Sequence, residues 1–572
     1  MTHKQWTILA SDPQKTLALQ KSLGISRILC RILVQRGIDS FEKARSYFRP
    51  GLEDLHDPWL MKDMDRAVAR VLQAIRNQEK ILLYGDYDVD GTTSVACLFD
   101  FLRPSVRPDQ LDFYIPNRYR EGYGISIAGV EWAIAGGFSL VIALDCGIKS
   151  AALIGFAREH GVDFIVCDHH LPDPELPPAA AILNPKQPGC LFPYKELCGC
   201  GVGFQFMRAL TQRLGRDPEQ LTAYLDLVAT AIGADIVPIT GENRVLAYYG
   251  LRKANQRPNP GIRALIELSG ARPELRMQNL VFLIAPRINA AGRMDDARKA
   301  VEMFLASTYE EALWYARLLH ADNSDRKEAD SAITGEALAL IEQDESVLPK
   351  RSTVVFQSHW HKGVVGIVAS RLIERYYRPT VVLTQNGEMA TGSARGINGF
   401  NLYEAIHACR DYLVGYGGHY AAAGLTLRLD QVEAFRIKFE EVVSGSLGTL
   451  VPVPEIRVDA EVDFPELTES LLRIVQQMEP FGPENGPPVF LTRGVYDTGH
   501  SRIVKDKHLR FSVQQQGALF TGIGFSMADQ FPLVSSGQAM DLVYTLEENE
   551  WNGQKNMQLH VLDLRVSGSD TG

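Results

Sequence analysis

The sequence predicts a multidomain α/β protein: a doubly wound parallel sheet, a long connecting helix, a smaller α/β domain and a C-terminal β-barrel or sandwich. Three observations indicate this class. Short apolar strands alternate with helical stretches over two separate blocks, which is typical of parallel sheets covered by helices. Residues 309–344 contain no proline and one glycine, and therefore predict a single long helix. Short alternating runs after residue 450 predict a small all-β domain.

The elements are expected in the following order. Residues 1–55 form a helical lead-in, because SRILCRILVQRG and FEKARSYF have helical apolar spacing. Residues 56–270 hold the first alternating block, with strands in ILLYG, DFYIP, SLVIALD, DFIVC and AAILN, followed by a helical region. Residues 271–349 connect the two blocks through the long helix. The second alternating block occupies 350–448 and the all-β domain 449–572.

Length and composition limit the class of protein. A chain of 572 residues can form roughly three to five domains. Hydrophobic residues make up 45% and charged residues 22%, which excludes a largely disordered, collagen-like or coiled-coil chain. No apolar run approaches the roughly 18–20 residues that span a bilayer, and the first residues lack the pattern of a secretory signal. We therefore expect a cytoplasmic protein with no membrane segment.

Net charge does not decide whether the protein binds nucleic acid, and the cysteines do not indicate a disulfide or zinc site. The formal charge of −10 gives no overall attraction to nucleic acid, but acids can gather at a metal site while Arg and Lys line a groove elsewhere. The eight cysteines match neither a disulfide framework nor the paired spacing of zinc ligands. We expect them to be reduced and mostly buried.

Acids and histidines follow the predicted strands of the first block, at the point where each strand ends. Open α/β sheets place their ligand crevice at this edge, and we expect alternate acids leaving a strand to point into one small volume. A further acid follows an apolar helical run and would be costly to bury unpaired. These residues are Asp86, Asp88, Asp90, Asp145, Asp168, His169, His170 and Asp235.

Carboxylates together with imidazole nitrogens suit Mn²⁺ or Mg²⁺ better than a thiolate-type zinc site. Several bridging acids suit two ions about 3.5–4 Å apart, the usual arrangement for activating water against a phosphoryl centre. The residues therefore indicate metal-assisted hydrolysis of a phosphoester. Two alternatives stay open from these residues alone: a solvated acidic turn at 86–90, and histidines with a purely structural role.

The motifs also resemble a known family. GDYDVDG, LDCG, CDHH and GADIVPI resemble the four motifs of the DHH phosphoesterase superfamily, in the same order. RINAAGRM, SHWHKGVVGIVASR, GSARG and GGHYAAAG resemble its companion DHHA1 domain. PFGPENGPPVF resembles the start of the terminal oligonucleotide-binding (OB) domain in the RecJ exonuclease family. The resemblance implies a DHH domain, a DHHA1 domain and a C-terminal OB-fold barrel.

The resemblance also implies residue roles and two divalent ions, Mn²⁺ or Mg²⁺. The metal ligands would be Asp88, Asp90, Asp145, His169 and Asp235, with Asp86 in the same motif. His170 would contact the scissile phosphate or assist the leaving group, and Asp145 would be catalytic as well as a ligand. The substrate-binding residues would be Arg287, Arg293, Ser393, Arg395, Gly417, Gly418 and His419.

Further DNA contacts are expected from two segments. Basic residues of SRIVKDKHLRFSV would lie beside Phe511 along one strand of the barrel. Trp360, His361 and Lys362 would stack on bases or grip the backbone, or would only shape a loop. The function implied is a 5′-to-3′ exonuclease specific for single-stranded DNA. It would release mononucleotides in recombination and mismatch repair, beside single-strand-binding protein and a helicase. The alternatives are a phosphoesterase of small molecules or oligonucleotides, and a catalytically silent scaffold for a replicative helicase.

Overall fold

A computed structural model describes residues 4–272, 274–344, 349–449, 452–551 and 554–568. The chain forms two compact units. One contains Ala290–Asp296 and Leu318–Ile456 with the first described residues, and the other contains Trp6–Asn289, Ala297–Arg317 and the part from Arg457 onward. Within the described residues, no helix is both long enough and apolar enough to cross a membrane.

A five-stranded parallel sheet organises the first block, with strand order β3-β2-β4-β5-β6. The first strand of this sheet along the sequence, β2, has β3 on one side and β4 on the other. The order of the strands therefore reverses between β2 and β4. Ligands bind at such switch points in doubly wound sheets. The strands are β2 (Ile81–Gly85), β3 (Leu111–Tyr114), β4 (Leu140–Leu144), β5 (Asp163–Cys167) and β6 (Ala181–Leu183).

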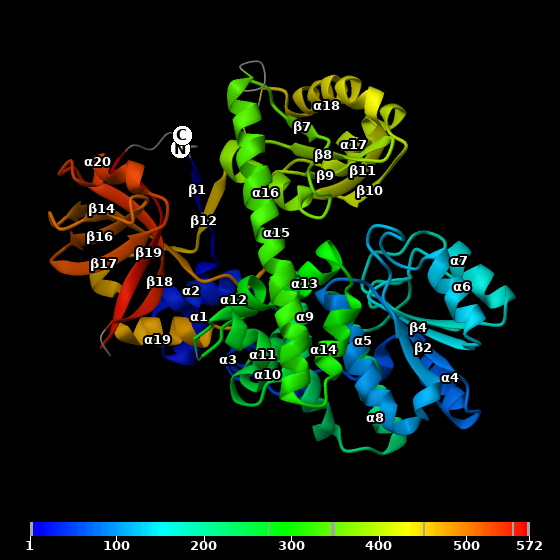
Figure 1. The fold of residues 1–572 in the computed structure, drawn as a ribbon. Helices are drawn as coiled ribbons and strands as arrows, with labels where there is room; N and C mark the ends of the chain where they lie inside the picture. The colour runs from blue at the N-terminus through cyan, green and yellow to red at the C-terminus, as the bar shows by residue number, and fades with distance from the viewer. Residues whose placement is uncertain (1–3, 273, 345–348, 450–451, 552–553, 569–572) are drawn as a thin grey trace. The chain divides into compact units, whose positions relative to one another are not determined.

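Helices cover both faces of this sheet (Figure 1). The central strands β2 and β4 are continuous apolar runs because both faces are buried. On one face Tyr84, Val141 and Phe164 pack against α6 and α7, and α5 and α8 lie on the other face with α4 beside α8. These helices are α4 (Met64–Arg76), α5 (Val89–Leu102), α6 (Ile127–Ala135), α7 (Ala151–Glu159) and α8 (Gly199–Leu214).

A helical region continues the same unit, as the sequence predicts. It contains α9 (Leu225–Ala234), α10 (Gly241–Gln256), α11 (Pro260–Ser269), the short α12 (Met277–Asn279), the start of α13 (Ala285–Met294) and α14 (Arg298–Leu305). From Ala290 onward, α13 belongs to the other unit. The long helix α15 (Tyr309–Gln343) then runs from this unit into the other, and its bounds confirm the predicted connecting helix.

The other unit holds a mixed five-stranded sheet of order β10-β11-β9-β8-β7. Buried Asp330 of α15 accepts hydrogen bonds from Arg371 of α16 at 2.7–3.1 Å and fixes the two helices together. Trp360 is 3% exposed and packs between them, so it cannot stack on a base. The elements are β7 (Thr353–Gln357), α16 (Val365–Tyr376), β8 (Thr380–Asn386), β9 (Met389–Arg395), α17 (Leu402–Ala408), β10 (Gly415–His419), β11 (Ala422–Arg428) and α18 (Val432–Leu447).

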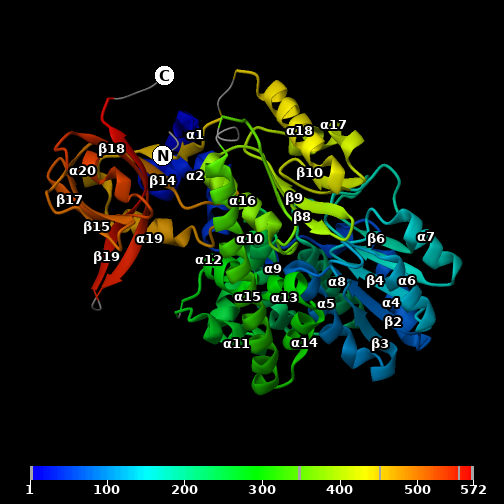
Figure 2. The same ribbon diagram turned by 45° about the horizontal axis from the view of Figure 1, so that its top comes forward.

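The C-terminal part is a closed barrel rather than a sandwich. Strands β14, β18, β19, β17 and β16 pair in that order, and β14 also pairs with β16, which closes the ring. Figure 2 shows β14, β17, β18 and β19 of this part in orange and red. Short strands β13 and β15 lie beside β14 and β16. The elements are β13 (Ala460–Glu461), α19 (Glu469–Gln477), β14 (Val489–Asp497), β15 (Arg502–Val504), β16 (His508–Gln515), β17 (Ala518–Gly524), α20 (Phe531–Val534), β18 (Met540–Trp551) and β19 (Gln554–Val566).

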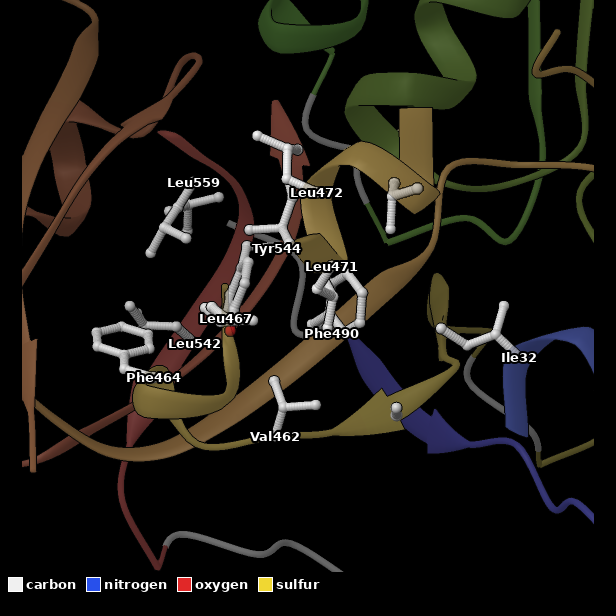
Figure 3. Close-up of a cluster of buried hydrophobic side chains, with 14 of the residues drawn as sticks. Ile32, Val462, Phe464, Leu467, Leu471, Leu472, Phe490, Leu542, Tyr544 and Leu559 are labelled. Atoms are coloured by element: carbon white, nitrogen blue, oxygen red, sulfur yellow. The ribbon is translucent and has the colours of Figure 1, made fainter. Parts of the chain in front are cut away.

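The N-terminal helices share a hydrophobic core with this barrel (Figure 3). Ile32 of α2 belongs to the same buried cluster as Val462, Phe464 and Phe490, and Gln35 donates to the backbone oxygen of Asp459 at 3.0 Å. The N-terminal helices therefore pack against the barrel as one core, and removing the barrel would expose their apolar side chains to water. Its elements are β1 (Gln5–Ile8), which pairs with β12 (Glu455–Val458), and helices α1 (Pro13–Leu23), α2 (Arg27–Gln35) and α3 (Phe41–Phe48).

Candidate metal centre

The three acids of GDYDVDG are brought together by a tight strand-to-helix turn. Asp86 directly follows β2, and Asp88 is the N-cap of α5, where its carboxylate accepts a hydrogen bond from Gly91 N at 3.1 Å. Asp90 lies in the first turn of α5. The expectation that alternation along an extended strand aligns these acids is therefore wrong, because the chain becomes helical at Val89.

Asp145 occupies a strained backbone position at the end of β4. Its φ of 60° is left-handed, a conformation that costs a non-glycine residue about 1–3 kcal/mol. Two hydrogen bonds hold it there: its N–H donates to Cys167 O at 2.9 Å, and the Tyr123 hydroxyl donates to its carbonyl at 2.9 Å. Strain held by surrounding contacts at an acid in a crevice is typical of a functional site.

His169 lies among three carboxylates. Its Nε2 is 3.2 Å from Asp145 Oδ1, 3.6 Å from Asp235 Oδ2 and 3.9 Å from Asp90 Oδ2. Three sets of potential ligand atoms lie within 4.8 Å of one another: Asp90, His169 and Asp235; Asp86, Asp88 and Asp145; and Asp145, His169 and His170. Because Asp145 and His169 belong to two sets each, neighbouring ions could share ligands.

Potential ligand atoms that make no hydrogen bond show that the cluster fits a cation. Asp145 Oδ1, Asp235 Oδ2 and His169 Nε2 are buried and make no hydrogen bond within the described residues. Buried polar atoms without partners are rare and each costs about 1–3 kcal/mol. Carboxylate oxygens with an imidazole nitrogen are the donor set that Mn²⁺ and Mg²⁺ accept, and a divalent ion would satisfy these atoms and offset their repulsion.

The ionisation of the acids reflects the same repulsion. Burial raises the pKa of Asp145 well above its usual range, and the charge of Asp90 raises it further. Burial and Asp88 raise the pKa of Asp90 to about 6, and burial and Asp90 raise the pKa of Asp235 to about 9. Without a cation, the cluster therefore retains protons at neutral pH.

His170 has a different environment from its neighbour. Asp168, buried beneath it, accepts hydrogen bonds from the backbone N–H groups of Ile148, His169 and His170, and lies 2.7 Å from His170 Nδ1. Burial alone would lower the pKa of His170, but Asp168 raises it above the usual value. By contrast, burial lowers the pKa of His169 to about 3. At neutral pH His169 is therefore neutral with a free lone pair, and His170 is the more readily protonated ring.

Sequence reasoning missed two residues here. The sequence places Asp168 in a motif but predicts no role for it, although its fixed carboxylate orients His170. Tyr123 was not singled out, yet its hydroxyl lies 3.2 Å from His170 Nε2 and donates to the carbonyl of Asp145. A tyrosine in an otherwise polar, glycine-containing loop carries no signal by itself, because its contact with β4 arises only in the fold.

Most of the predicted substrate residues of the other unit share one face of its sheet. Cross-strand register places Arg395, Ala422 and His419 in one row and Ser393, Gly424 and Gly417 in the adjacent row. Arg395 donates to Ser393 Oγ at 2.6 Å, which fixes the guanidinium over this surface. Gly418 lies between the rows with a φ of 156°, where an added Cβ would be 2.4 Å from Ala422 O.

The remaining two arginines are not on open surfaces. Arg287 is 5% exposed and donates to the carbonyl of Leu283 in the preceding turn. Arg293 belongs to the other unit, where it donates to Gly363 O at 3.0 Å. Their contact with substrate stays a prediction.

The barrel carries a basic and aromatic face, for which the sequence predicts the basic segment but not the aromatic residue. Phe511 is fully buried, so it cannot stack on a base. Phe525 is 57% exposed instead, with the ring of His508 at 5.2 Å. On the same sheet, Arg502 and Arg510 are directly opposite each other, and neither side chain has a hydrogen bond or ion pair within the described part of the chain. Like charges facing each other are unfavourable unless an anion binds them.

Comparisons with known proteins agree with this architecture. Residues 80–232 match the family model of the DHH family N-terminal domain, 350–445 that of the DHHA1 domain, and 458–563 that of the RecJ OB domain. The chain is 37% identical over 567 residues to the single-stranded-DNA-specific exonuclease RecJ of Bacillus subtilis, covering 98% of this chain and 71% of that protein. It is 33% identical to the exonuclease of that name from Escherichia coli, over 93% of this chain and 94% of the relative.

A solved structure shares the whole fold. The crystal structure of RecJ in complex with Mn²⁺ from Thermus thermophilus superposes with a TM-score of 0.84 at 28% identity. The match covers 98% of this chain and 79% of that one.

Proposed function

The chain belongs to the RecJ family of single-stranded-DNA-specific exonucleases, and from this premise we propose that it is a metal-dependent hydrolase that shortens single-stranded DNA from one end. The observation that carries the proposal is the buried cluster of carboxylates around His169, whose unsatisfied oxygen and nitrogen atoms suit divalent ions. Relatives that bind Mn²⁺ and Mg²⁺ support the choice of metal.

The proposed ligands are Asp86, Asp88, Asp90, Asp145, His169 and Asp235. When bound, the divalent ions supply Lewis acidity that activates water and neutralises the charge that develops on the phosphate. His169 contributes a neutral ring, because burial keeps its pKa near 3. Asp145 is the central ligand of the proposal because its carboxylate belongs to two of the three clusters.

His170 would act on the phosphate rather than on the metal. Its Nδ1 is held 2.7 Å from Asp168 and its side chain is 40% exposed. Nε2, which lies 3.2 Å from the Tyr123 hydroxyl, is therefore the ring atom that would turn to a substrate. Because Asp168 raises its pKa, His170 can present a proton to a phosphate oxygen or to the leaving oxygen near neutral pH.

Substrate grip is proposed for two other surfaces. The row of Arg395 and His419, with Ser393 beside it, offers a guanidinium fork and an imidazole donor to a phosphate. On the barrel, Arg502 and Arg510 would bind the backbone, and Phe525 would stack on a base. None of these groups reads base edges, so we expect binding to be independent of sequence.

The finer parts of the proposal rest on the family. They are the 5′-to-3′ direction, release of mononucleotides, a role in recombination and mismatch repair, location in the cytoplasm, and work beside single-strand-binding protein and a helicase. The small-molecule alternative is disfavoured because the chain carries the RecJ OB domain. A silent scaffold is disfavoured because all the proposed ligands are present.

The test uses end-labelled DNA with the full-length protein. We expect degradation of single strands with Mn²⁺ or Mg²⁺, no degradation with chelator, and resistance of blunt duplex. Labelling the 5′ or the 3′ end separately determines the direction. Equal rates on blunt duplex and single strand, or activity that survives chelation, would contradict the proposal.

A further inference from the structure

The first turn of α8 lies directly against two of the proposed metal ligands. Gly199 N donates to Asp90 Oδ2 at 2.6 Å, and Cys200 N donates to Asp90 Oδ1 at 2.7 Å. These two amides have no acceptor within their own helix, because the first N–H groups of any helix lack a partner four residues earlier. The N-cap residue, Cys198, uses its sulfur for Gly201 N and leaves them free. Asp90 of α5 thus caps α8 from another part of the chain.

These bonds hold Asp90 without using up its capacity to bind metal. A carboxylate has about four lone-pair positions, and the two amides occupy one on each oxygen. Asp90 Oδ2 still lies 3.9 Å from His169 Nε2, within the cluster. The positive end of the α8 dipole also lies at this carboxylate and favours its charged form. The first turn therefore fixes the orientation of a buried ligand and stabilises its charge.

Position 199 also sets the space available to Asp145. A Cβ added to Gly199 would lie 2.6 Å from Asp145 Cβ and 2.8 Å from Asp145 Oδ1, closer than real Cβ contacts allow. Gly199 does not have a positive φ, so space and not backbone conformation requires a glycine here. Asp145 cannot retreat easily, because Tyr123 and Cys167 fix its backbone in the left-handed conformation.

We propose that Gly199 is a positioning residue of the metal centre: its N–H orients Asp90, and its missing side chain leaves Asp145 in its place. The inference rests on the proposed metal site but not on the nuclease activity. An added methyl group at 199 would displace Asp145 or withdraw the amides from Asp90. Either movement would separate side chains that together would hold the divalent ions.

The test compares two alanine variants of the same helix in the full-length protein. Gly199→Ala should weaken Mn²⁺ binding at least about tenfold in calorimetry on chelator-stripped protein, as supporting residues of metal sites typically do. Gly203→Ala is the matched control, because its Cβ would meet only Leu144 Cδ2 at an ordinary 3.5 Å. Cleavage by Gly199→Ala should recover partly at high Mn²⁺, whereas its affinity for single-stranded DNA in chelator should equal that of the wild type. Unchanged Mn²⁺ affinity in a folded Gly199→Ala protein would overturn the proposal.

A second measurement does not depend on the variant folding. In the wild-type protein, hydrogen exchange of a peptide that contains Gly199 and Cys200 should slow at least about tenfold when Mn²⁺ saturates the protein, since the metal immobilises the acceptor Asp90. The later turns of α8 should be unaffected. Exchange of these amides that is indifferent to Mn²⁺ would also overturn the proposal. If instead the wild type binds Mn²⁺ but does not degrade DNA, the proposed function fails and the positioning role of Gly199 stands.

Discussion

Metal binding should release protons, because the empty cluster holds them. At pH 7 a carboxyl group with a pKa of about 9, as for Asp235, is about 99% protonated, and one with a pKa of about 6, as for Asp90, is about 10% protonated. Asp145, whose pKa is raised well above its usual range, adds a further share. A ligand must lose its proton to bind Mn²⁺. We therefore expect release of at least about one proton per protein at pH 7.

Proton release makes the Kd for Mn²⁺ depend on pH, and it can be measured by calorimetry. Each proton released makes the apparent Kd for Mn²⁺ fall about tenfold for every unit of pH between about 7 and 8. Calorimetric titration in PIPES and in Tris measures the number of protons, because the two buffers differ in ionisation enthalpy and neither precipitates Mn²⁺. Asp235→Asn is the control: it should bind Mn²⁺ more weakly and release about one proton fewer. The same observed enthalpy in both buffers, with a Kd independent of pH, would refute the reasoning.

The same shifts predict how stability depends on pH. A carboxyl whose folded pKa is raised contributes stability below its unfolded pKa, near 3.8 for Asp235, and loses that contribution as pH rises through the folded pKa of about 9. The metal-free protein should therefore become less stable between pH 6 and 9. Added Mn²⁺ cancels the repulsion, so the rise in Tm that it produces should be larger at pH 9 than at pH 6.

Three further perturbations test separate parts of the molecule. His169→Ala should raise the Kd for Mn²⁺ at least about tenfold. His170→Ala should leave this Kd within about twofold and lower the rate of single-turnover cleavage about 10²–10³-fold. Equal loss of Mn²⁺ binding in both variants would show that both rings bind the ion. Arg510→Glu should weaken binding of single-stranded DNA in chelator and reduce its salt dependence by roughly one unit of slope; anisotropy at two salt concentrations measures both, and unchanged values would exclude this face. Arg244→Ala removes a buried guanidinium that donates to the carbonyls of Tyr47, near the end of α3, and of Met478 and Glu479, between α19 and β14. It should lower the free energy of unfolding in urea by about 3 kcal/mol. Arg428→Ala, at an exposed position, should lower it by less than about 0.5 kcal/mol.

The sheet and the long helix could be predicted because each is encoded locally. Strand β4 is five consecutive buried apolar residues, a pattern that arises when both faces of a parallel strand are covered. Helix α15 contains no proline and a single glycine over its 35 positions. Both signals lie within one element and need no knowledge of its neighbours.

The partner of an apolar face could not be predicted in the same way. The spacing in α2 shows that Ile32 faces a core, but not that the core belongs to a barrel more than 400 positions later. Hydrophobic burial is non-directional, so periodicity identifies a buried face without identifying what covers it. Arg244 shows the same limit for polar groups, because its acceptors are all backbone carbonyls and carry no sequence signal.

The metal centre is also only partly predictable from the sequence. Strand ends predict which acids meet, because parallel strands finish at one edge of a sheet. The chemistry of each acid or ring depends on contacts that only the fold supplies, and the two adjacent histidines show this most directly. Identical in type, they differ because Asp168 bonds the ring of His170, whereas His169 is buried and faces carboxylates that a cation must neutralise. One carboxylate, placed by three backbone N–H groups at the end of β5, therefore separates a proposed metal ligand from a proposed proton donor.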